Sequence, residues 1–256
     1  MKIGFVGAGR MGSAMAHGWA GADGLDAELS FTDAEPERAE RLASKLGGVA
    51  LGSISELTDH SDLLVLAMKP AQLSEVAAEM ADATNPVVSM LGGTSLAAVE
   101  EALPRSPVLR VIPNQGVSVR RGVLCFALSN RFDEAAAEPV IELLQALGTA
   151  IELSDDQIDA ATAVMSCAPA YVALFAGTLI AAGERAGLSP ADATLAVAET
   201  IAGTGELLRE RPPDEISEAV ASPGGITEAG LETLDREGFA DALRAAVDTT
   251  LEKMRK

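Results

Sequence analysis

Three glycines near the N-terminus have the spacing of a nucleotide-binding loop. An apolar stretch, residues 2–6, is followed by Gly7, Gly9 and Gly12 in the pattern G-x-G-x-x-G. In that pattern the first glycine permits a tight turn. The second lets the backbone approach a pyrophosphate, and the third lets a helix pack closely on a strand. Because the free N–H groups at a helix start attract phosphates, this loop predicts a dinucleotide site rather than a merely structural turn.

A carboxylate follows at the distance that such a site requires. Residues 28–32 are typical of a second strand, and Asp33 comes directly after it, 21 residues beyond Gly12. A carboxylate there accepts hydrogen bonds from a ribose 2′-hydroxyl and repels a 2′-phosphate, which favours NADH over NADPH. Arg10 and Arg38 are close enough in sequence to offset part of that repulsion. Asp33 could instead be a turn or helix-capping residue.

A second stretch with chemical potential lies far along the chain, from Ser222 to Thr227, and reads SPGGIT. A Pro-Gly-Gly loop that opens a helix exposes several backbone N–H groups at the positive end of the helix dipole. Such a loop would hold a substrate carboxylate, and the hydroxyl of Thr227 could bond to a ring nitrogen. A plain turn between two helices is the alternative interpretation.

The C-terminal part of the chain has few groups that could donate a proton to a reaction. Both histidines lie within the first 60 residues, and the only lysines beyond Lys69 are Lys253 and Lys256. Many carbonyl reductions need such a group to protonate the alkoxide that forms. An imine that is already protonated needs none, because hydride delivery gives a neutral amine. The chain therefore favours imine reduction, with Tyr171 or Cys167 as other conceivable donors.

Several stretches together resemble those of pyrroline-5-carboxylate reductases. They are GFVGAGRMG at 4–12, LAMKP at 66–70, RVIPN at 110–114, DAATAV and APAYV within 159–172, and VASPGGIT at 220–227. The last is the most specific of them. The resemblance implies a Rossmann domain followed by a helical domain that dimerises through interlocking helices, often within larger rings. It also implies reduction of 1-pyrroline-5-carboxylate to L-proline with NADH or NADPH.

The motifs and the resemblance together give the candidate site residues. The expected cofactor-binding residues are Gly7, Ala8, Gly9, Arg10, Met11, Gly12, Asp33, Ala67, Met68, Lys69, Pro70 and Asn114. By position in the family pattern, the expected substrate-binding residues are Glu210, Ser222, Gly224, Gly225, Ile226 and Thr227. Thr227 is the catalytic candidate, and no metal is expected.

Two stretches depart from the family pattern beside the expected active site. The family usually reads Ser-Gly-Ser-Gly-Pro-Ala-Tyr, whereas residues 165–171 read MSCAPAY. It usually reads Pro-Asn-Thr-Pro, whereas residues 113–116 read PNQG. Two alternatives therefore stay open: a reductase of a different cyclic imine, and a nucleotide-binding interaction protein without catalysis. A hydroxyacid dehydrogenase is less favoured, because the lysine expected in its helical domain is missing.

The elements that must position these residues divide the chain in two. Strands are expected at 28–32, 63–68, 86–91, 108–112 and 122–128, with a helix over about 133–147. Strands that alternate with helices predict a doubly wound α/β sheet. Helices alone are expected after residue 153, over 155–186, 190–210, 214–221 and 227–254. We therefore expect a dinucleotide-binding domain over residues 1–152 and an all-helical substrate and dimerisation domain over residues 153–256.

The composition limits the partners and the compartment. A net charge of −19 disfavours nucleic acid, which binds basic surfaces. Apolar residues make up 48% of the chain and aromatic ones only 3%, so small aliphatic side chains must fill the core. The two cysteines lack metal-ligand spacing and indicate no disulfide framework. No signal peptide and no apolar run of about 18 residues is recognisable, and a cytoplasmic protein that does not contact membranes is expected.

Overall fold

Strands and helices alternate along the first part of the chain, as the apolar runs predict. The computed structural model describes residues 1–22 and 24–254. Its elements up to the last strand are β1 (Lys2–Val6), α1 (Arg10–Ala20), β2 (Glu28–Thr32), α2 (Pro36–Leu46), β3 (Val49–Ala50), α3 (Ile54–His60), β4 (Leu63–Leu66), η1 (Pro70–Gln72), α4 (Leu73–Glu79), β5 (Val87–Ser89), α5 (Leu96–Ala102), β6 (Val108–Pro113), η2 (Gln115–Val119), β7 (Gly122–Leu128), α6 (Glu134–Gln145) and β8 (Gly148–Glu152).

The strands form one sheet of eight in the order β3-β2-β1-β4-β5-β6-β7-β8. All neighbouring pairs are parallel except β6 and β7, which are antiparallel. The chain moves outward from β1 to β3 on one side and then returns to place β4 on the other. The carboxyl ends of β1, β2 and β4 therefore meet at the point where the strand order reverses, which is where open α/β sheets bind ligands.

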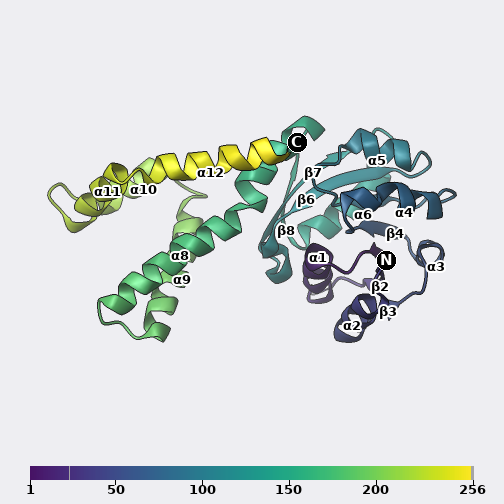
Figure 1. The fold of residues 1–256 in the computed structure, drawn as a ribbon, viewed down its shortest axis with the longest axis horizontal. Coiled ribbons are helices and arrows are strands. Elements are labelled where there is room, and N and C mark those ends of the chain that lie inside the picture. Colours follow the sequence, from purple (N-terminus) through teal and green to yellow (C-terminus); the bar gives the residue numbers. More distant parts are fainter. Residues whose placement is uncertain (23, 255–256) are drawn as a thin grey trace. The chain divides into compact units, whose positions relative to one another are not determined.

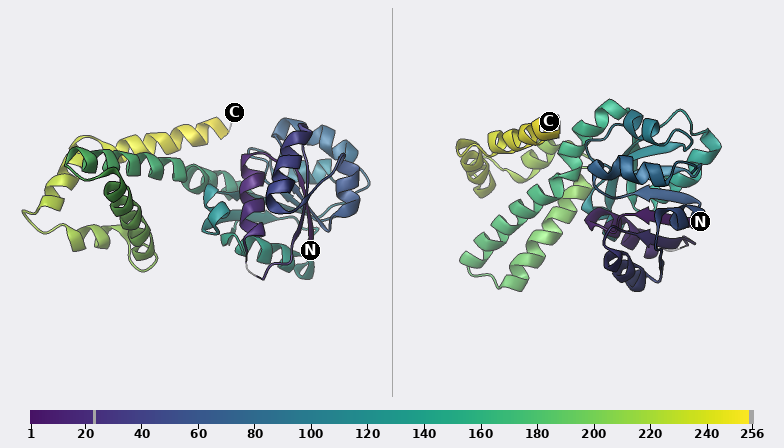
Figure 2. Two further views of the ribbon diagram at one scale, coloured as in Figure 1. Left: turned by 90° about the horizontal axis from the view of Figure 1, so that it is seen from below. Right: turned by 45° about the vertical axis from the view of Figure 1, so that its right-hand side comes forward.

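Helices cover both faces of this sheet (Figures 1 and 2). On one face, side chains of α1, α2 and α6 pack on the sheet around Trp19 and Leu144; on the other, those of α3, α4 and α5 pack around Leu57 and Val99. Side chains of a single strand pack against the helices on both faces of the sheet, because successive residues point to opposite faces. All four residues of β4 are buried for this reason, and the expected doubly wound fold is confirmed.

A long helical part follows the sheet, also as expected. It contains η3 (Asp155–Gln157), α7 (Ile158–Ala161), η4 (Thr162–Ser166, a π-helical turn), α8 (Ala168–Arg185), α9 (Pro190–Leu207), α10 (Pro213–Val220), α11 (Ile226–Arg236) and α12 (Phe239–Met254). Ser189 caps α9, accepting a hydrogen bond from the Asp192 N–H. The helix expected over 227–254 is interrupted at Gly238, whose φ of +73° ends α11.

The chain divides into two compact units, Met1–Cys167 and Ala168–Met254. The first unit ends 15 residues beyond the expected boundary at residue 152. The reason is a buried arginine on β6. The Nη1 atom of Arg110 donates to Asp155 Oδ1 at 2.7 Å, and its Nη2 atom donates to Asp159 Oδ1 at 3.1 Å. Ile158, between the two aspartates, packs on β6 and β7. The helical segment after β8 is therefore part of the first unit.

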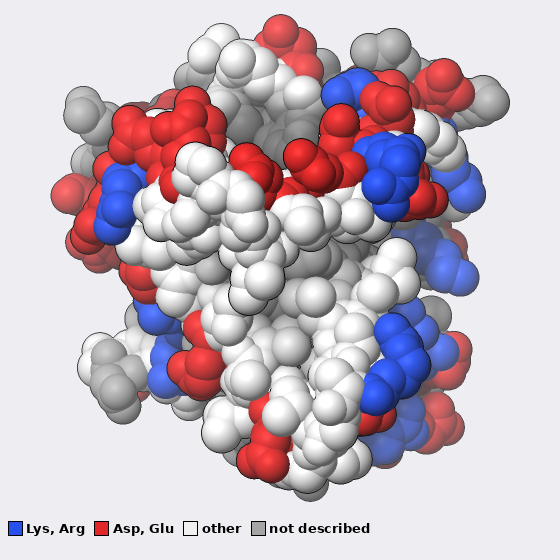
Figure 3. All heavy atoms as spheres, turned by 90° about the vertical axis from the view of Figure 1, so that its left-hand side faces the viewer, with Lys and Arg blue, Asp and Glu red and all other residues white. Residues whose placement is uncertain are grey.

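The second unit has almost no apolar interior of its own. Among the described residues from Ala168 to Met254, Ala193 is the one buried apolar side chain. Large apolar residues are exposed instead, and Leu174 on α8 is 74% exposed. Figure 3 shows a broad uncharged area with both acidic and basic side chains along its borders. An exposed apolar area of this extent marks an interaction surface.

One helical stretch, Asp155–Arg185, is long and apolar enough to cross a membrane by length and composition. The expectation that no such stretch exists is therefore wrong. The stretch meets the criterion because α8 has few charged residues and has alanines and leucines on all sides. Length and composition alone are weak evidence for a membrane span, because helices buried in a soluble core or interface meet the same criterion.

The arginine on β6 gives a prediction about stability. Arg110 is 3% exposed, whereas its partners Asp155 and Asp159 are partly solvated. We expect Arg110→Met to lower the free energy of unfolding by about 2 kcal/mol, less than the ~3–5 kcal/mol typical of a fully buried pair, because water can hydrate the remaining carboxylates. Urea denaturation measures the change. Arg105→Met, which breaks an exposed pair with Asp82, is the matched control and should have no measurable effect. Equal stability of both variants would contradict the prediction.

Candidate functional site

The glycine loop is held tightly between neighbouring strands. Gly7 has a φ of +104°, and its N–H donates to the Thr32 carbonyl oxygen on β2 at 2.8 Å. A Cβ atom on Gly7 would lie 2.8 Å from the carbonyl carbon of Ala67 and from the amide nitrogen of Met68. Any larger residue would therefore push the loop away from the end of β4. A Cβ on Gly12 would meet the Gly7 carbonyl oxygen at 2.8 Å, so Gly12 allows α1 to pack closely.

Gly9 differs from the other two glycines because the space above it is open. The nearest atom to a Cβ built there is the Ala67 carbonyl oxygen at 4.0 Å. Gly9 is also the N-cap of α1, and no side chain caps that helix start. The first amides of α1 are thus uncapped beside open space, with no acidic residue in the first turn. These features fit a pyrophosphate group.

Asp33 is bonded to the backbone on both of its oxygens. Oδ2 accepts the Ala8 N–H at 2.7 Å, and Oδ1 accepts the Glu35 N–H at 2.9 Å. The first bond ties the glycine loop to the end of β2, and the second forms the turn that leads into α2. A carboxylate has about four acceptor sites, so bonding to a ribose hydroxyl is still compatible with these contacts. Asp33 nevertheless acts as a turn residue in this structure.

A pocket of about 690 Å³ opens at the carboxyl ends of β1, β2 and β4. Six of the expected cofactor residues line it: Gly7, Gly9, Asp33, Ala67, Met68 and Lys69. Further lining comes from residues that the sequence analysis did not select, including Gly52 and Ser53 before α3 and Gln72, Glu75 and Glu79 after β4. The backbone N–H of Lys69 is held by the side-chain oxygen of Gln72 at 3.2 Å, which fixes the β4 loop beside the pocket.

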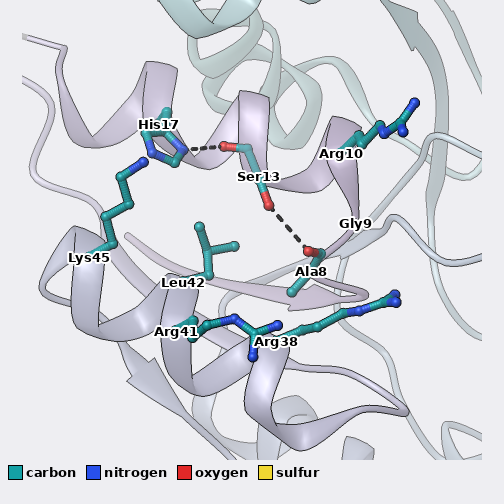
Figure 4. Close-up of a pocket in the computed structure, with 9 residues that line it drawn as sticks. All are labelled: Ala8, Gly9, Arg10, Ser13, His17, Arg38, Arg41, Leu42 and Lys45. Atoms are coloured by element: carbon teal, nitrogen blue, oxygen red, sulfur yellow. Dashed lines mark hydrogen bonds between the residues drawn. The ribbon is translucent and has the colours of Figure 1, made fainter.

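A second pocket, of about 520 Å³, lies between α1 and α2 and is shown in Figure 4. Ala8, Gly9 and Arg10 line it as expected cofactor residues, together with Ser13, His17, Arg38, Arg41, Leu42 and Lys45. Arg41 and Lys45 were not selected from the sequence. The sequence does contain a signal for this pocket, because Arg38, Arg41 and Lys45 recur at helical spacing and so share one face of α2.

The remaining expected cofactor residues lie outside both pockets. Met11 packs against the core, and Pro70 begins η1. Asn114 has structural contacts: its Oδ1 atom accepts the Gly116 and Val123 N–H groups, and its Nδ2 atom donates to the Met165 carbonyl oxygen at 3.2 Å. The side chain of Asn114 thus joins β6 to the helical segment that follows β8.

The two departures from the family pattern meet at this junction. Residues Thr162–Ser166 form a π-helical turn, a feature often found at functional sites. The Ser166 hydroxyl donates to the Pro113 carbonyl oxygen at 3.1 Å. A Cβ on Gly116 would lie 2.7 Å from the Arg121 carbonyl oxygen, so glycine is required there. The unusual residues therefore stabilise a local structure of their own.

The expected substrate loop lies in the second unit, at the start of α11. Gly224 has a φ of +72°, its N–H donates to Glu228 Oε2 at 2.6 Å, and the Gly225 N–H donates to the Ser222 carbonyl oxygen at 2.8 Å. In contrast, the amides of Ile226 and Thr227 have no partner among the described residues. Two uncapped N–H groups at a helix start can bind a carboxylate.

Other expected groups of the second unit are solvent-exposed. Ile226 is 94% exposed, and Glu210 follows α9 with its side chain exposed. Neither cysteine is bonded to another. Burial in β7 raises the pKa of the Cys125 thiol, so this group stays protonated and unreactive.

Two family models match this chain. Residues 155–256 match the family model for pyrroline-5-carboxylate reductase dimerisation, and residues 2–93 match a model for coenzyme F420-dependent NADP oxidoreductases. A pyrroline-5-carboxylate reductase of Aquifex aeolicus is 31% identical over the whole chain and 97% of its own length. The chain belongs to the pyrroline-5-carboxylate reductase family. A reductase of Mycobacterium tuberculosis is 32% identical, with 96% of this chain and 93% of the relative covered.

Solved structures of this reductase family have the same fold. The pyrroline-5-carboxylate reductase of Streptococcus pyogenes superposes with a TM-score of 0.89 at 28% identity, covering 99% of this chain and 98% of its own. The enzyme of Plasmodium falciparum, with NADP bound, gives a TM-score of 0.87 at 28% identity, covering 99% and 97%. These comparisons confirm the predicted family, the fold and the use of NAD(P)H. The match to the reductase dimerisation model supports the formation of homo-oligomers.

The double bonding of Asp33 gives a second prediction. Asparagine at this position keeps one acceptor oxygen, so either the Ala8 or the Glu35 N–H loses its partner. We expect Asp33→Asn to weaken NADH and NADPH alike, by about threefold to thirtyfold, which corresponds to one backbone hydrogen bond. Titration of nicotinamide fluorescence measures both affinities. A loss confined to NADH would contradict this prediction, because it would mean that Asp33 acts on the ribose and not on the loop.

Proposed function

We propose that this protein reduces 1-pyrroline-5-carboxylate to L-proline with NADH or NADPH as the reductant. The observation that carries the proposal is the end-to-end match with pyrroline-5-carboxylate reductases, which spans the nucleotide loop and the SPGGIT loop in one chain. The protein would act in the cytoplasm on a small imino acid, with neither nucleic acid nor a membrane as a partner.

The reaction moves one hydride and one proton. The ring nitrogen is protonated first, which makes the imine carbon electrophilic. The bound cofactor supplies the hydride to that carbon, and the electron pair of the C=N bond passes to nitrogen. The product is a neutral secondary amine, so no anion forms that would need a strong acid nearby. This chemistry agrees with the absence of histidine between Lys69 and the end of the chain.

Residues of the second unit would hold the substrate. The unpartnered amides of Ile226 and Thr227 can donate hydrogen bonds to the substrate carboxylate at the start of α11. The Thr227 hydroxyl would bond to the ring nitrogen and orient the imine. Ser222, Gly224 and Gly225 shape the loop, in which a positive φ at Gly224 makes the turn. Glu210 is expected to face the same substrate, by its position in the family pattern.

Residues of the first unit would hold the cofactor. The pyrophosphate would lie over Gly9 and the uncapped start of α1. The loop after β4, from Ala67 to Lys69, would border the rest of the dinucleotide. A different cyclic imine is the second candidate substrate. It is favoured by the Ser166 side chain and by the requirement for glycine at position 116, both at the family's active-site motifs.

A steady-state assay tests the proposed reaction. We expect pyrroline-5-carboxylate to oxidise NADH or NADPH, followed as loss of nicotinamide absorbance. Thr227→Ala should lower kcat by about tenfold to a hundredfold, because it removes a hydrogen bond to the reacting group. The KM for the cofactor should stay within about twofold, since Thr227 lies in the other unit.

Thr227→Ser is the matched control, because it retains the hydroxyl and should recover most of the lost rate. Turnover with a six-membered cyclic imino acid but not with pyrroline-5-carboxylate would favour the second candidate. No turnover of either imine, with cofactor binding intact, would reject catalysis. An unchanged rate in Thr227→Ala would remove Thr227 from the site.

The exposed apolar surface of the second unit would pair with a second copy of the chain as a homodimer or within a larger ring. We expect Leu174→Glu to shift the protein toward monomer, because it places a charge among exposed apolar groups on α8. Light scattering coupled to gel filtration measures the mass. Val119→Glu, at a 66% exposed residue of the first unit, is the control and should leave the mass unchanged. An unaltered mass of Leu174→Glu would place the interface elsewhere.

A further inference from the structure

Glu228 is a charged residue whose side chain bonds directly to the backbone of the SPGGIT loop. Its Oε2 atom accepts the Gly224 N–H at 2.6 Å. Glu228 is the third residue of α11, so its side chain turns back over the start of the helix. A glutamate at this position commonly bonds to a backbone N–H just before its helix. Here that N–H belongs to the loop proposed to hold the substrate carboxylate, so a carboxylate of the protein already lies there.

The Glu228 bond decides which donors of the loop are free. The loop has four successive N–H groups, at residues 224–227. Glu228 accepts the first, and the Ser222 carbonyl oxygen accepts the second at 2.8 Å. The last two, on Ile226 and Thr227, have no partner in the described part of the chain. An anion that enters the loop therefore finds one pair of neighbouring free donors, beside the Thr227 hydroxyl.

The turn itself is closed by contacts that do not involve Glu228. Gly224 has a φ of +72°, and the Gly225 N–H closes the turn onto the Ser222 carbonyl oxygen. A Cβ atom on Gly225 would lie 2.8 Å from that same oxygen, so the turn also requires a residue without a side chain. Because these contacts shape the loop, turn formation alone does not account for the carboxylate of Glu228.

The charge of Glu228 is not balanced by a cation of the protein. No described residue forms an ion pair with it, and its side chain is partly buried. A substrate carboxylate that approached Gly224 would be repelled by this like charge. The free amides of Ile226 and Thr227, at the positive end of the helix dipole, would attract it instead.

We propose that Glu228 is a positioning residue that sets where in the loop the substrate carboxylate binds. It acts by occupying the Gly224 N–H. In pyrroline-5-carboxylate the carboxylate and the ring nitrogen are attached to the same carbon atom. A carboxylate bound at Gly224 would therefore carry the ring nitrogen away from the Thr227 hydroxyl. This inference rests on the proposed function for the identity of the substrate.

Steady-state kinetics of Glu228→Ala test the proposal. This change frees the Gly224 N–H and removes the repulsion, so pyrroline-5-carboxylate should also bind away from Thr227. Such non-productive binding lowers kcat and KM together. We expect each to fall by about threefold to tenfold, with kcat/KM changed by less than about twofold. Glu228→Gln keeps an acceptor oxygen for Gly224 and should restore kcat to within about twofold of wild type. Glu232→Ala, at an exposed residue one turn further along α11, is the matched control and should change neither constant.

The substrate 1-pyrroline separates positioning from a general effect on folding. It has the same imine but no carboxylate to misplace, so its kcat and KM should be the same in Glu228→Ala as in wild type. An equal loss of kcat with both imines would overturn the proposal. A higher KM for pyrroline-5-carboxylate with unchanged kcat would also overturn it, because Glu228 would then only support the loop. Thermal denaturation of each variant verifies folding.

A binding measurement keeps this proposal separate from the proposed function. Cyclopentanecarboxylate has the ring and the carboxylate but no imine, and calorimetric titration measures its affinity without turnover. We expect it to bind Glu228→Ala about threefold to tenfold more tightly than wild type, since a further N–H is free and the repulsion is gone. Equal or weaker binding would overturn the proposal. Failure of wild type to reduce pyrroline-5-carboxylate would reject the proposed function, and this titration would still decide the role of Glu228.

Discussion

The glycine loop depends on one close backbone contact, between Gly7 and the end of β4. A Cβ atom on Gly7 would overlap Ala67 and Met68, so only a bare backbone lets β1, β2 and β4 end side by side. The bonds from Gly7 to Thr32 and from Ala8 to Asp33 then hold the loop to β2. This arrangement places the start of α1 between both pockets. Gly9 of this loop lines both the pocket at the strand ends and the pocket between α1 and α2.

The sequence predicts those strands whose buried residues form one continuous apolar run. Strands such as β4 are buried on both faces and read as continuous apolar runs. In contrast, β3 has two residues and β8 alternates exposed and partly exposed ones, so neither gives a strong pattern. The segment after β8 joins the sheet through Arg110, which pairs with aspartates 45 and 49 residues away. No local pattern can reveal such a contact.

The sequence offers a candidate site where a motif is continuous, and it gives a weaker signal where two elements assemble the site. The glycine loop and the SPGGIT loop are each contiguous in sequence. The pocket between α1 and α2 is built from two separate helix faces. The spacing of Arg38, Arg41 and Lys45 marks one of these faces, but the cavity forms only where α1 and α2 lie side by side. The same limit applies to α8. Its even apolar composition predicts a helix but not what covers it, because a membrane, a core and a second subunit require the same residues.

The proposed cofactor site and the proposed substrate site must each bind an anion. A chain of net charge −19 repels an anionic cofactor and an anionic substrate alike, although salt screens that repulsion beyond about 8 Å. Binding must therefore rely on donors in direct contact with each ligand. Around the glycine loop the proposed donors are the uncapped amides at the start of α1, and guanidinium groups line the pocket beside them. In the SPGGIT loop, which has no lysine or arginine, the proposed donors are the amides of Ile226 and Thr227. Both proposed sites therefore use helix-terminal amides, and the cations beside the glycine loop match the larger negative charge of a pyrophosphate.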